Sequence, residues 1–176
     1  MKFPTVIVLA SGRGTRFAAS GGSTHKLQAK LAHKTVLQHT LDAVIASGLP
    51  WYLEQGGLPG MGDSIAAAVR SNAQAAGWLI LPADLPLIQS DTLRAVADAL
   101  REHEVVLPMV QQQRGHPVGF SARCGEDLRK LQGDQGAARV VRRYAAFELA
   151  LDDLGCVTDI DTLDDLRAAE RLLRER

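Results

Sequence analysis

The sequence has little of several features that mark particular protein classes. It contains two cysteines, Cys124 and Cys156, which are far apart and lack paired spacing, so we expect buried free thiols rather than a disulfide or a metal site. Lysines plus arginines equal aspartates plus glutamates at 20 each, which argues against nucleic acid held by bulk positive charge. No apolar run approaches the roughly 20 residues of a membrane span, and the first residues carry no signal-peptide pattern. We therefore expect a cytoplasmic protein with no membrane and no nucleic acid partner.

Internal repeats, low-complexity tracts and linkers are also absent, and the composition, 46% hydrophobic and 23% charged, is ordinary for a globular protein. By size, residues 1–176 are expected to form a single domain. Apolar strand patterns alternate with helical patterns throughout, which predicts an α/β fold with a mainly parallel sheet, right-handed crossovers and helices around it. Strands are expected over 78–81, 105–107 and 51–54, with an edge strand over 147–151, and helices over 35–47, 91–100 capped by Ser90, 126–131 and 163–173 capped by Thr162.

The opening of the chain combines a buried strand with a glycine-containing loop. The apolar run from Thr5 to Leu9 predicts a strand buried on both faces. Gly12 and Gly14 then allow a tight turn that brings backbone N–H groups close to a ligand. Arg13 and Arg16 add positive charge to this turn. The combination predicts a loop that binds a polyphosphate.

Two common phosphate-binding motifs do not fit this loop. The dinucleotide fingerprint requires a third glycine, and Phe17 stands at its position. A P-loop requires Gly-Lys-Ser/Thr at its end, and that triplet is missing. Lys26 follows a flexible Ser-Gly-Gly-Ser-Thr segment; alone it reads as an ordinary surface lysine, but after a phosphate loop its mobile ammonium could follow charge on the α- and β-phosphates.

A second glycine-rich segment, Gly60-Met61-Gly62-Asp63-Ser64, has two interpretations. It can be a plain loop in which Asp63 or Ser64 caps a helix over 65–75. It can also be a second nucleotide-contacting loop, in which Gly60 and Gly62 expose backbone groups to a base or ribose. The segment alone does not decide between them.

Aspartates follow extended segments at two places in the chain. Asp84 comes directly after the apolar strand 78–81, where the carboxyl ends of parallel strands form the ligand-binding crevice. It is a candidate Mg²⁺ ligand, or else a turn cap. Asp159 and Asp161 lie on one side of an extended segment. One of them, with Asp161 nearer the strand end, is a candidate second metal contact, although the acidic residues here can also cap the last helix.

The segment Arg114-Gly115-His116-Pro117 reads as a loop that enters a strand. A single histidine is more often a hydrogen-bonded structural residue than a catalytic one. The flanking residues nevertheless favour contact between His116 and a substrate, although not a role as a base.

Five separated motifs together resemble the MobA-like NTP transferases, most closely the molybdenum cofactor cytidylyltransferase branch. They are Leu9-Ala10-Ser11-Gly12-Arg13-Gly14-Thr15-Arg16-Phe17 with Lys26-Leu27, then Gly60-Met61-Gly62-Asp63-Ser64, Ala83-Asp84-Leu85-Pro86, Arg114-Gly115-His116-Pro117-Val118, and Gly133-Asp134-Gln135-Gly136-Ala137 leading to Asp159-Ile160-Asp161-Thr162. The first and third are shared with many nucleotidyltransferases, and the others narrow the resemblance to this branch. The family usually has a further strand and helix between the positions of Gly48 and Gly60, where this chain has only a short connection.

The resemblance implies a Rossmann-like three-layer α/β/α fold of the nucleotide-diphospho-sugar transferase type. It also implies a reaction: a terminal phosphate oxygen of molybdopterin attacks the α-phosphate of CTP, which transfers CMP and releases pyrophosphate with Mg²⁺ as cofactor. A molybdoenzyme is a possible maturation partner. The alternatives are a sugar-1-phosphate nucleotidyltransferase, a nicotinamide-dependent oxidoreductase and a non-catalytic nucleotide-binding protein of cofactor maturation.

The resemblance further implies a role for each motif residue. The implied catalytic residues are Arg16, Lys26 and Asp84, and the implied metal ligands are Asp84 and Asp161. The implied nucleotide-binding residues are Leu9, Ala10, Ser11, Gly12, Arg13, Gly14, Lys26, Gly60, Met61, Gly62, Ser64 and Asp84. The implied acceptor-binding residues are Arg114, His116, Asp134 and Arg139.

Overall fold

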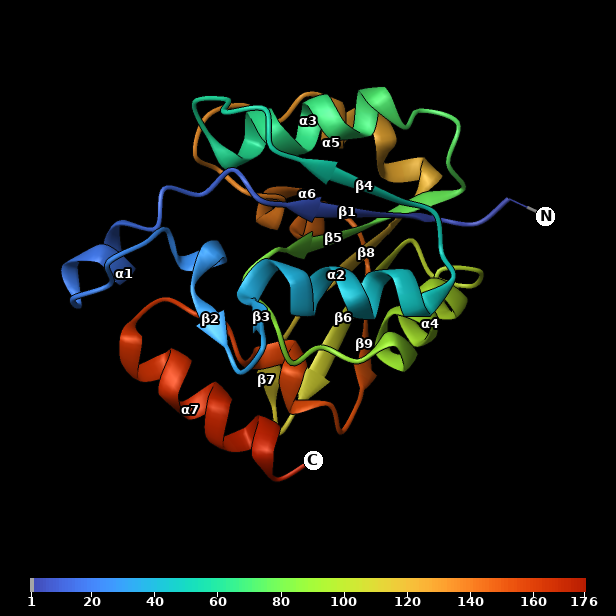
Figure 1. Cartoon of the computed structure of the whole chain (residues 1–176). Coiled ribbons are helices and arrows are strands. Elements are labelled where there is room, and N and C mark those ends of the chain that lie inside the picture. Colours follow the sequence, from blue (N-terminus) through green and yellow to red (C-terminus); the bar gives the residue numbers. More distant parts are fainter. Residues whose placement is uncertain (1) are drawn as a thin grey trace.

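A seven-stranded sheet forms the centre of the computed structural model, which describes residues 2–176 (Figure 1). Its strands are β1 (Thr5–Leu9), β4 (Trp51–Glu54), β5 (Gly77–Pro82), β6 (Val105–Val110), β7 (Gln113–Arg114), β8 (Val118–Ser121) and β9 (Ala146–Ala150). The strand order is β4-β1-β5-β8-β6-β7. Strand β9 lies outside this order and pairs with residues 105–109 of β6. A separate small hairpin contains β2 (Lys30–Leu31) and β3 (Lys34–Thr35).

The sheet is mostly parallel, as the alternating pattern predicts. β1 pairs in parallel with β4 on one side and β5 on the other, and β6 pairs in parallel with β9. Val6, Ile7 and Val8 of β1 have no exposed surface, which agrees with a strand covered on both faces. The two exceptions are β8, which runs antiparallel between β5 and β6, and β7, which pairs antiparallel with β6.

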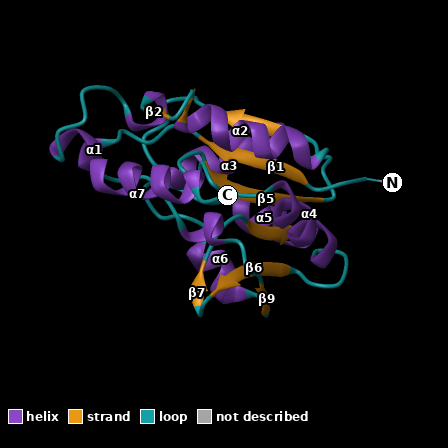
Figure 2. Ribbon diagram, turned by 60° about the horizontal axis from the view of Figure 1, so that its bottom comes forward, coloured by secondary structure: helices purple, strands orange, loops and turns teal. Residues whose placement is uncertain are grey.

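Helices cover both faces of the sheet and complete the three-layer α/β/α arrangement (Figure 2). One apolar cluster contains residues of α2 (Val36–Ser47), α4 (Ser90–Ala99) and α7 (Leu163–Arg174), and the other contains residues of α3 (Met61–Ser71), α5 (Gly125–Arg129) and α6 (Ala138–Arg143). The short helix α1 (Thr15–Ala19) lies beyond the arrowhead of β1 (Figure 1). The carboxyl ends of the central strands therefore open toward α1 and the start of α7.

Capping boxes begin two of the helices, α2 and α7, and helices α3 and α4 begin earlier than predicted. Thr35 caps α2 and Thr162 caps α7, each through a capping box that satisfies the first free N–H groups. Helix α3 begins at Met61, four residues before the predicted start, and Gly60 holds the cap position without a side-chain bond. Asp63 is not the cap, because its carboxylate accepts a hydrogen bond from the backbone N–H of Gly133. Helix α4 begins one residue early, at Ser90, so the predicted cap is wrong: Gln89 holds the cap position and makes no side-chain cap bond.

Both cysteine thiols are buried and free, as predicted. Burial raises the pKa of Cys124 to about 11 and that of Cys156 to about 12. Among residues 2–176, no helix combines the length and the apolar character needed to cross a membrane.

Candidate functional site

A cleft of about 660 Å³ opens at the carboxyl ends of β1 and β5. Open α/β sheets bind ligands at this edge, because the loops that follow parallel strands meet there. Segments that are far apart in the sequence line the cleft: Leu9, Ser11–Phe17, Lys26, Leu27, Leu58–Met61, Ser64, Pro82–Leu85, Gln113, Arg114, His116, Asp134, Cys156, Val157, Asp159 and Asp161. The cleft therefore brings together residues from all five sequence motifs.

The glycine-containing loop after β1 forms one wall of the cleft. Gly14 has a φ of 65°, a left-handed conformation that glycine adopts without strain, and α1 starts at the next residue. His25 holds the loop in place: its Nε2 lies 2.7 Å from the carbonyl oxygen of Gly12, while its Nδ1 accepts a hydrogen bond from the Leu27 N–H. Sequence reasoning did not select His25, whose bond joins two separate loops.

Three aspartates meet on the opposite wall. Asp84 follows β5, and its backbone carbonyl accepts a 3.0 Å hydrogen bond from the N–H of Ile160. This bond holds the extended segment before α7 against the end of β5, so that Asp159 and Asp161 lie beside Asp84. One oxygen from each of the three carboxylates lies within 4.8 Å of the others.

This group has the chemistry of a divalent-cation site. Mg²⁺ and similar hard cations prefer carboxylate oxygens together with water and substrate phosphates. The Oδ1 atom of Asp84 is buried and has no hydrogen-bond partner, which is costly unless a ligand satisfies it. Burial raises the pKa of Asp159, and the negative charges of Asp84 and Asp161 add to that effect. The residues present therefore fit a bound cation.

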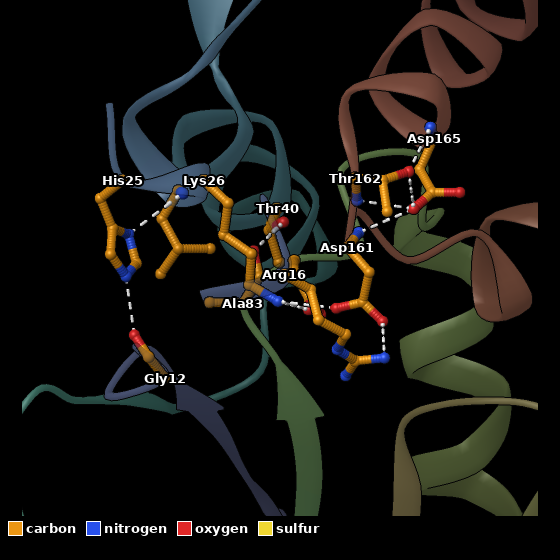
Figure 3. Close-up of polar contacts among 11 residues, drawn as sticks. Gly12, Arg16, His25, Lys26, Thr40, Ala83, Asp161, Thr162 and Asp165 are labelled. Carbon is orange, nitrogen blue, oxygen red and sulfur yellow. Dashed lines mark hydrogen bonds and ion pairs between the residues drawn. The ribbon is translucent and has the colours of Figure 1, made fainter. Parts of the chain in front are cut away.

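Two basic residues from the phosphate-loop side contact these carboxylates. Lys26 Nζ lies 2.6 Å from Asp84 Oδ2 and 3.2 Å from Asp161 Oδ1, and Arg16 Nη1 lies 2.9 Å from Asp161 Oδ2. Figure 3 shows Arg16 and Lys26 converging on Asp161, with Asp165 and Thr162 behind it. Burial alone would lower the pKa of Lys26, but the ion pairs with Asp84 and then Asp161 outweigh it and raise that pKa. Lys26 is therefore an ammonium ion across the neutral range.

The glycines of the second glycine-rich segment allow close backbone packing. A Cβ atom on Gly60 would lie 2.2 Å from the backbone of Gly133, and one on Gly62 would lie 2.7 Å from the carbonyl oxygen of Gln135. The N–H of Gly62 donates a 2.8 Å hydrogen bond to the Gly133 carbonyl. Two of the sequence motifs thus pack against each other, and the contact brings Asp134 to the rim of the cleft.

His116 lies where the chain leaves β7 and before it enters β8. Its backbone N–H donates to the carbonyl of Cys156 instead of to a neighbouring strand, and its peptide bond to Pro117 is cis. The Nδ1 atom of His116 is buried without a partner. Burial lowers the pKa of His116, although the nearby Asp84 charge opposes this. A neutral imidazole with a free nitrogen therefore lines the cleft.

Most residues selected from the sequence line this cleft, but three do not. Ala10 is the residue after β1, and its N–H donates a hydrogen bond to the carbonyl of Glu54. Gly62 faces the 132–135 loop, as described above, so its backbone N–H is not free for a ribose or base. Arg139 is exposed on α6, outside the cleft lining. These three positions lie outside the cleft lining, and their ligand contacts stay predictions.

The sequence of residues 43–148, more than half of the chain, matches the MobA-like NTP transferase domain. The chain belongs to this family. Membership in the MobA-like NTP transferases makes nucleotidyltransferase chemistry the general function class of the protein, and it confirms the predicted resemblance to this family.

Solved structures of similar fold cover almost the whole of this MobA-like chain. Rv0371c from Mycobacterium tuberculosis H37Rv shares 27% sequence identity, covers 97% of this chain and 98% of its own, and gives a TM-score of 0.81. A second structure of Rv0371c, a complex with manganese, gives 24% identity, the same coverage and a TM-score of 0.77. Molybdopterin-guanine dinucleotide biosynthesis protein A from Archaeoglobus fulgidus gives 17% identity, coverage of 98% and 100%, and a TM-score of 0.71. These likenesses support the Rossmann-like fold assignment.

Proposed function

We propose that this protein transfers CMP from CTP to a phosphate acceptor of the molybdopterin type and releases pyrophosphate. One observation carries the proposal: a glycine-containing loop and an aspartate cluster face each other across one cleft, and Arg16 and Lys26 reach from the loop to the aspartates. A triphosphate that binds between the two walls would meet both. The choice of CTP and of molybdopterin comes from the motif resemblance.

The loop and its basic residues would hold the triphosphate. Backbone N–H groups of Gly12, Arg13 and Gly14 would bind the β- and γ-phosphates. The ammonium of Lys26 and the guanidinium of Arg16 would move onto the α-phosphate and the leaving pyrophosphate, where negative charge grows in the transition state. Phosphoryl-type transfer depends mainly on positioning and charge neutralisation, so these residues would supply much of the rate acceleration.

Asp84 and Asp161 would hold Mg²⁺, with Asp159 beside them. When bound, the cation would neutralise phosphate charge and help to align the triphosphate. The acceptor phosphate is already anionic, so the reaction needs no protein base to activate it. His116 fits this scheme, because a neutral imidazole whose Nδ1 atom is buried and unpartnered offers hydrogen bonding without taking up a proton.

The rest of the cleft would bind the nucleoside and the acceptor. Ser11, Gly60, Met61 and Ser64 lie together beside the phosphate loop and would contact the base and ribose. Arg114, His116 and Asp134 also line the cleft and would face the acceptor, and Asp134 lies next to Gly60. Arg114 supplies the positive charge that a phosphate acceptor requires.

The test is a panel of ATP, CTP, GTP and UTP, each with Mg²⁺ and with or without a molybdopterin acceptor, read out as pyrophosphate release. We expect release only with acceptor and fastest with CTP. Release that is fastest with a sugar 1-phosphate as acceptor would replace this proposal with a sugar-nucleotide synthesis. Tight CTP binding by calorimetry with no release on any acceptor would identify a non-catalytic nucleotide-binding protein.

A further inference from the structure

The proposed cation ligands already have positive partners, and both partners belong to the proposed triphosphate site. Lys26 Nζ contacts Oδ2 of Asp84 and Oδ1 of Asp161, and Arg16 contacts the second oxygen of Asp161. Of the four oxygens on Asp84 and Asp161, only Oδ1 of Asp84 is left, and it has no partner. Without a ligand, the protein therefore neutralises Asp84 and Asp161 with its own phosphate-binding side chains.

The lysine and a divalent cation would compete for one position. Mg²⁺ binds oxygen ligands at about 2.1 Å. A cation shared by Asp84 and Asp161 would therefore lie close to the present position of Lys26 Nζ, which is 2.6 and 3.2 Å from these same carboxylates. Two positive charges so near each other repel strongly in a partly buried site, so one of them must leave.

Lys26 has a route by which to leave. Its side chain is 13% exposed, and its four-carbon stem is flexible. The Cγ atom of Lys26 lies 3.5 Å from the point that a Cβ atom on Gly14 would occupy, so the stem runs alongside the phosphate loop. A rotation about the outer bonds would carry the ammonium from the aspartates to phosphates bound at that loop. Arg16 is 77% exposed and can move in the same way.

We infer that Lys26, assisted by Arg16, occupies the divalent-cation position in the free protein and gives it up only when a triphosphate draws the ammonium away. This inference rests on the proposed function, since it requires a cation and a triphosphate in this cleft. Cation and nucleotide then bind cooperatively: each is weak alone, and each strengthens the other by the same factor. The lysine thereby prevents unproductive loading of the metal ligands in the absence of substrate.

The test measures Mn²⁺ binding to the nucleotide-free protein, read from the loss of the electron paramagnetic resonance signal of free Mn²⁺. Lys26→Met removes the competing charge and keeps most of the apolar stem. We expect this variant to bind Mn²⁺ on the order of tenfold more tightly than the unchanged protein, although it loses a residue assigned to catalysis. With a non-hydrolysable CTP analogue present, and after subtraction of the Mn²⁺ that the analogue binds without protein, the difference should vanish or reverse. Lys30→Met, at an exposed lysine four residues away, is the matched control. It should leave Mn²⁺ affinity unchanged both with and without the CTP analogue.

A second variant protects the test against a folding defect. Arg16→Met alters a mostly exposed side chain and should also tighten Mn²⁺ binding without nucleotide, by a smaller factor. If Lys26→Met does not give the circular dichroism spectrum of the unchanged protein, Arg16→Met decides the question.

Failure of this inference can be told apart from failure of the proposed function. One result would overturn the inference and leave the cation site standing. In that result, Mn²⁺ binds in the presence of the CTP analogue, Asp84→Asn abolishes this binding, and Lys26→Met and Arg16→Met bind Mn²⁺ no more tightly than the unchanged protein. Mn²⁺ binding that is absent with the analogue, or is unaffected by Asp84→Asn, would overturn both.

Discussion

The hydroxyl oxygens of Ser11 and Ser64 lie 3.1 Å apart, and their contact joins the phosphate loop to the first turn of α3. Ser64 is 1% exposed, so its side of this contact is shielded from water. We expect Ser64→Ala to lower the free energy of unfolding by about 1 kcal/mol and to raise the KM for the nucleotide, because the loop loses a fixed neighbour. Urea unfolding and initial rates measure the two effects. Ser71→Ala, at the exposed end of the same helix, should change neither, and equal behaviour of the two variants would contradict the prediction.

Replacement of Asp84 tests the proposed metal ligand. We expect Asp84→Ala to reduce Mg²⁺-dependent pyrophosphate release by about 10²-fold or more, because the cation would lose a ligand at the end of β5. The fold should persist, since Lys26 keeps its ion pair with Asp161. The matched control is Asp98→Ala, which removes an exposed carboxylate from α4. Unchanged turnover of Asp84→Ala at saturating CTP and Mg²⁺ would show that the metal assignment is wrong.

Replacement of Lys26 separates binding from chemistry. The transition state carries more charge on the α-phosphate and the leaving group than the bound substrate does, so a mobile ammonium should act mainly on turnover. We expect Lys26→Ala to lower kcat on the order of 10²-fold and to change KM by much less. Steady-state kinetics with CTP varied at fixed acceptor give both values. A change confined to KM would make Lys26 a ground-state binding residue.

The sequence predicts the central elements of this fold because local patterns determine them. The apolar run Thr5–Leu9 has to be buried on both faces, and a carboxylate directly after a buried strand, such as Asp84, has to lie at the ligand-binding edge. The antiparallel β8 is different. Its direction depends on tertiary pairing with β5 and β6, and a four-residue segment carries no signal for it.

The same reasoning applies to the candidate site. A glycine is required wherever a backbone comes close to another group, and the sequence does not say whether that group is a ligand or the chain itself. At Gly62 the neighbouring group is the carbonyl of Gln135, and contact of this residue with the nucleotide stays a prediction. His25 was missed for a related reason: its bond to the Gly12 carbonyl joins two loops across a gap that no local pattern describes.

The hairpin between β6 and β7 should be easy to stabilise. Its connecting residues, Gln111 and Gln112, have φ values of 49° and 65°, in the left-handed region that costs energy for residues with a Cβ. Two-residue hairpin turns with positive φ at both positions favour Asn-Gly. We expect the double change Gln111→Asn and Gln112→Gly to raise the free energy of unfolding by about 1 kcal/mol, measured in urea. Gln112→Val should do the opposite, because β-branched residues tolerate this region poorly. Equal stability of the three proteins would refute the interpretation.

The buried thiols should make stability fall at alkaline pH. Burial raises the pKa values of Cys124 and Cys156 from 9.0 to about 11 and about 12. Between these values the unfolded chain has lost thiol protons that the folded chain keeps, so the free energy of unfolding is highest below pH 9 and decreases as the pH rises toward 11 to 12. The double variant Cys124→Ala and Cys156→Ala should show a shallower decrease over the same range in urea titrations at fixed pH values.

The folded protein should also resist iodoacetamide at pH 8 and become alkylated at both cysteines in guanidinium, because the thiolate is the reactive form. Rapid alkylation of the folded protein at Cys156, which lines the cleft, would show that its thiol is neither buried nor protonated as described.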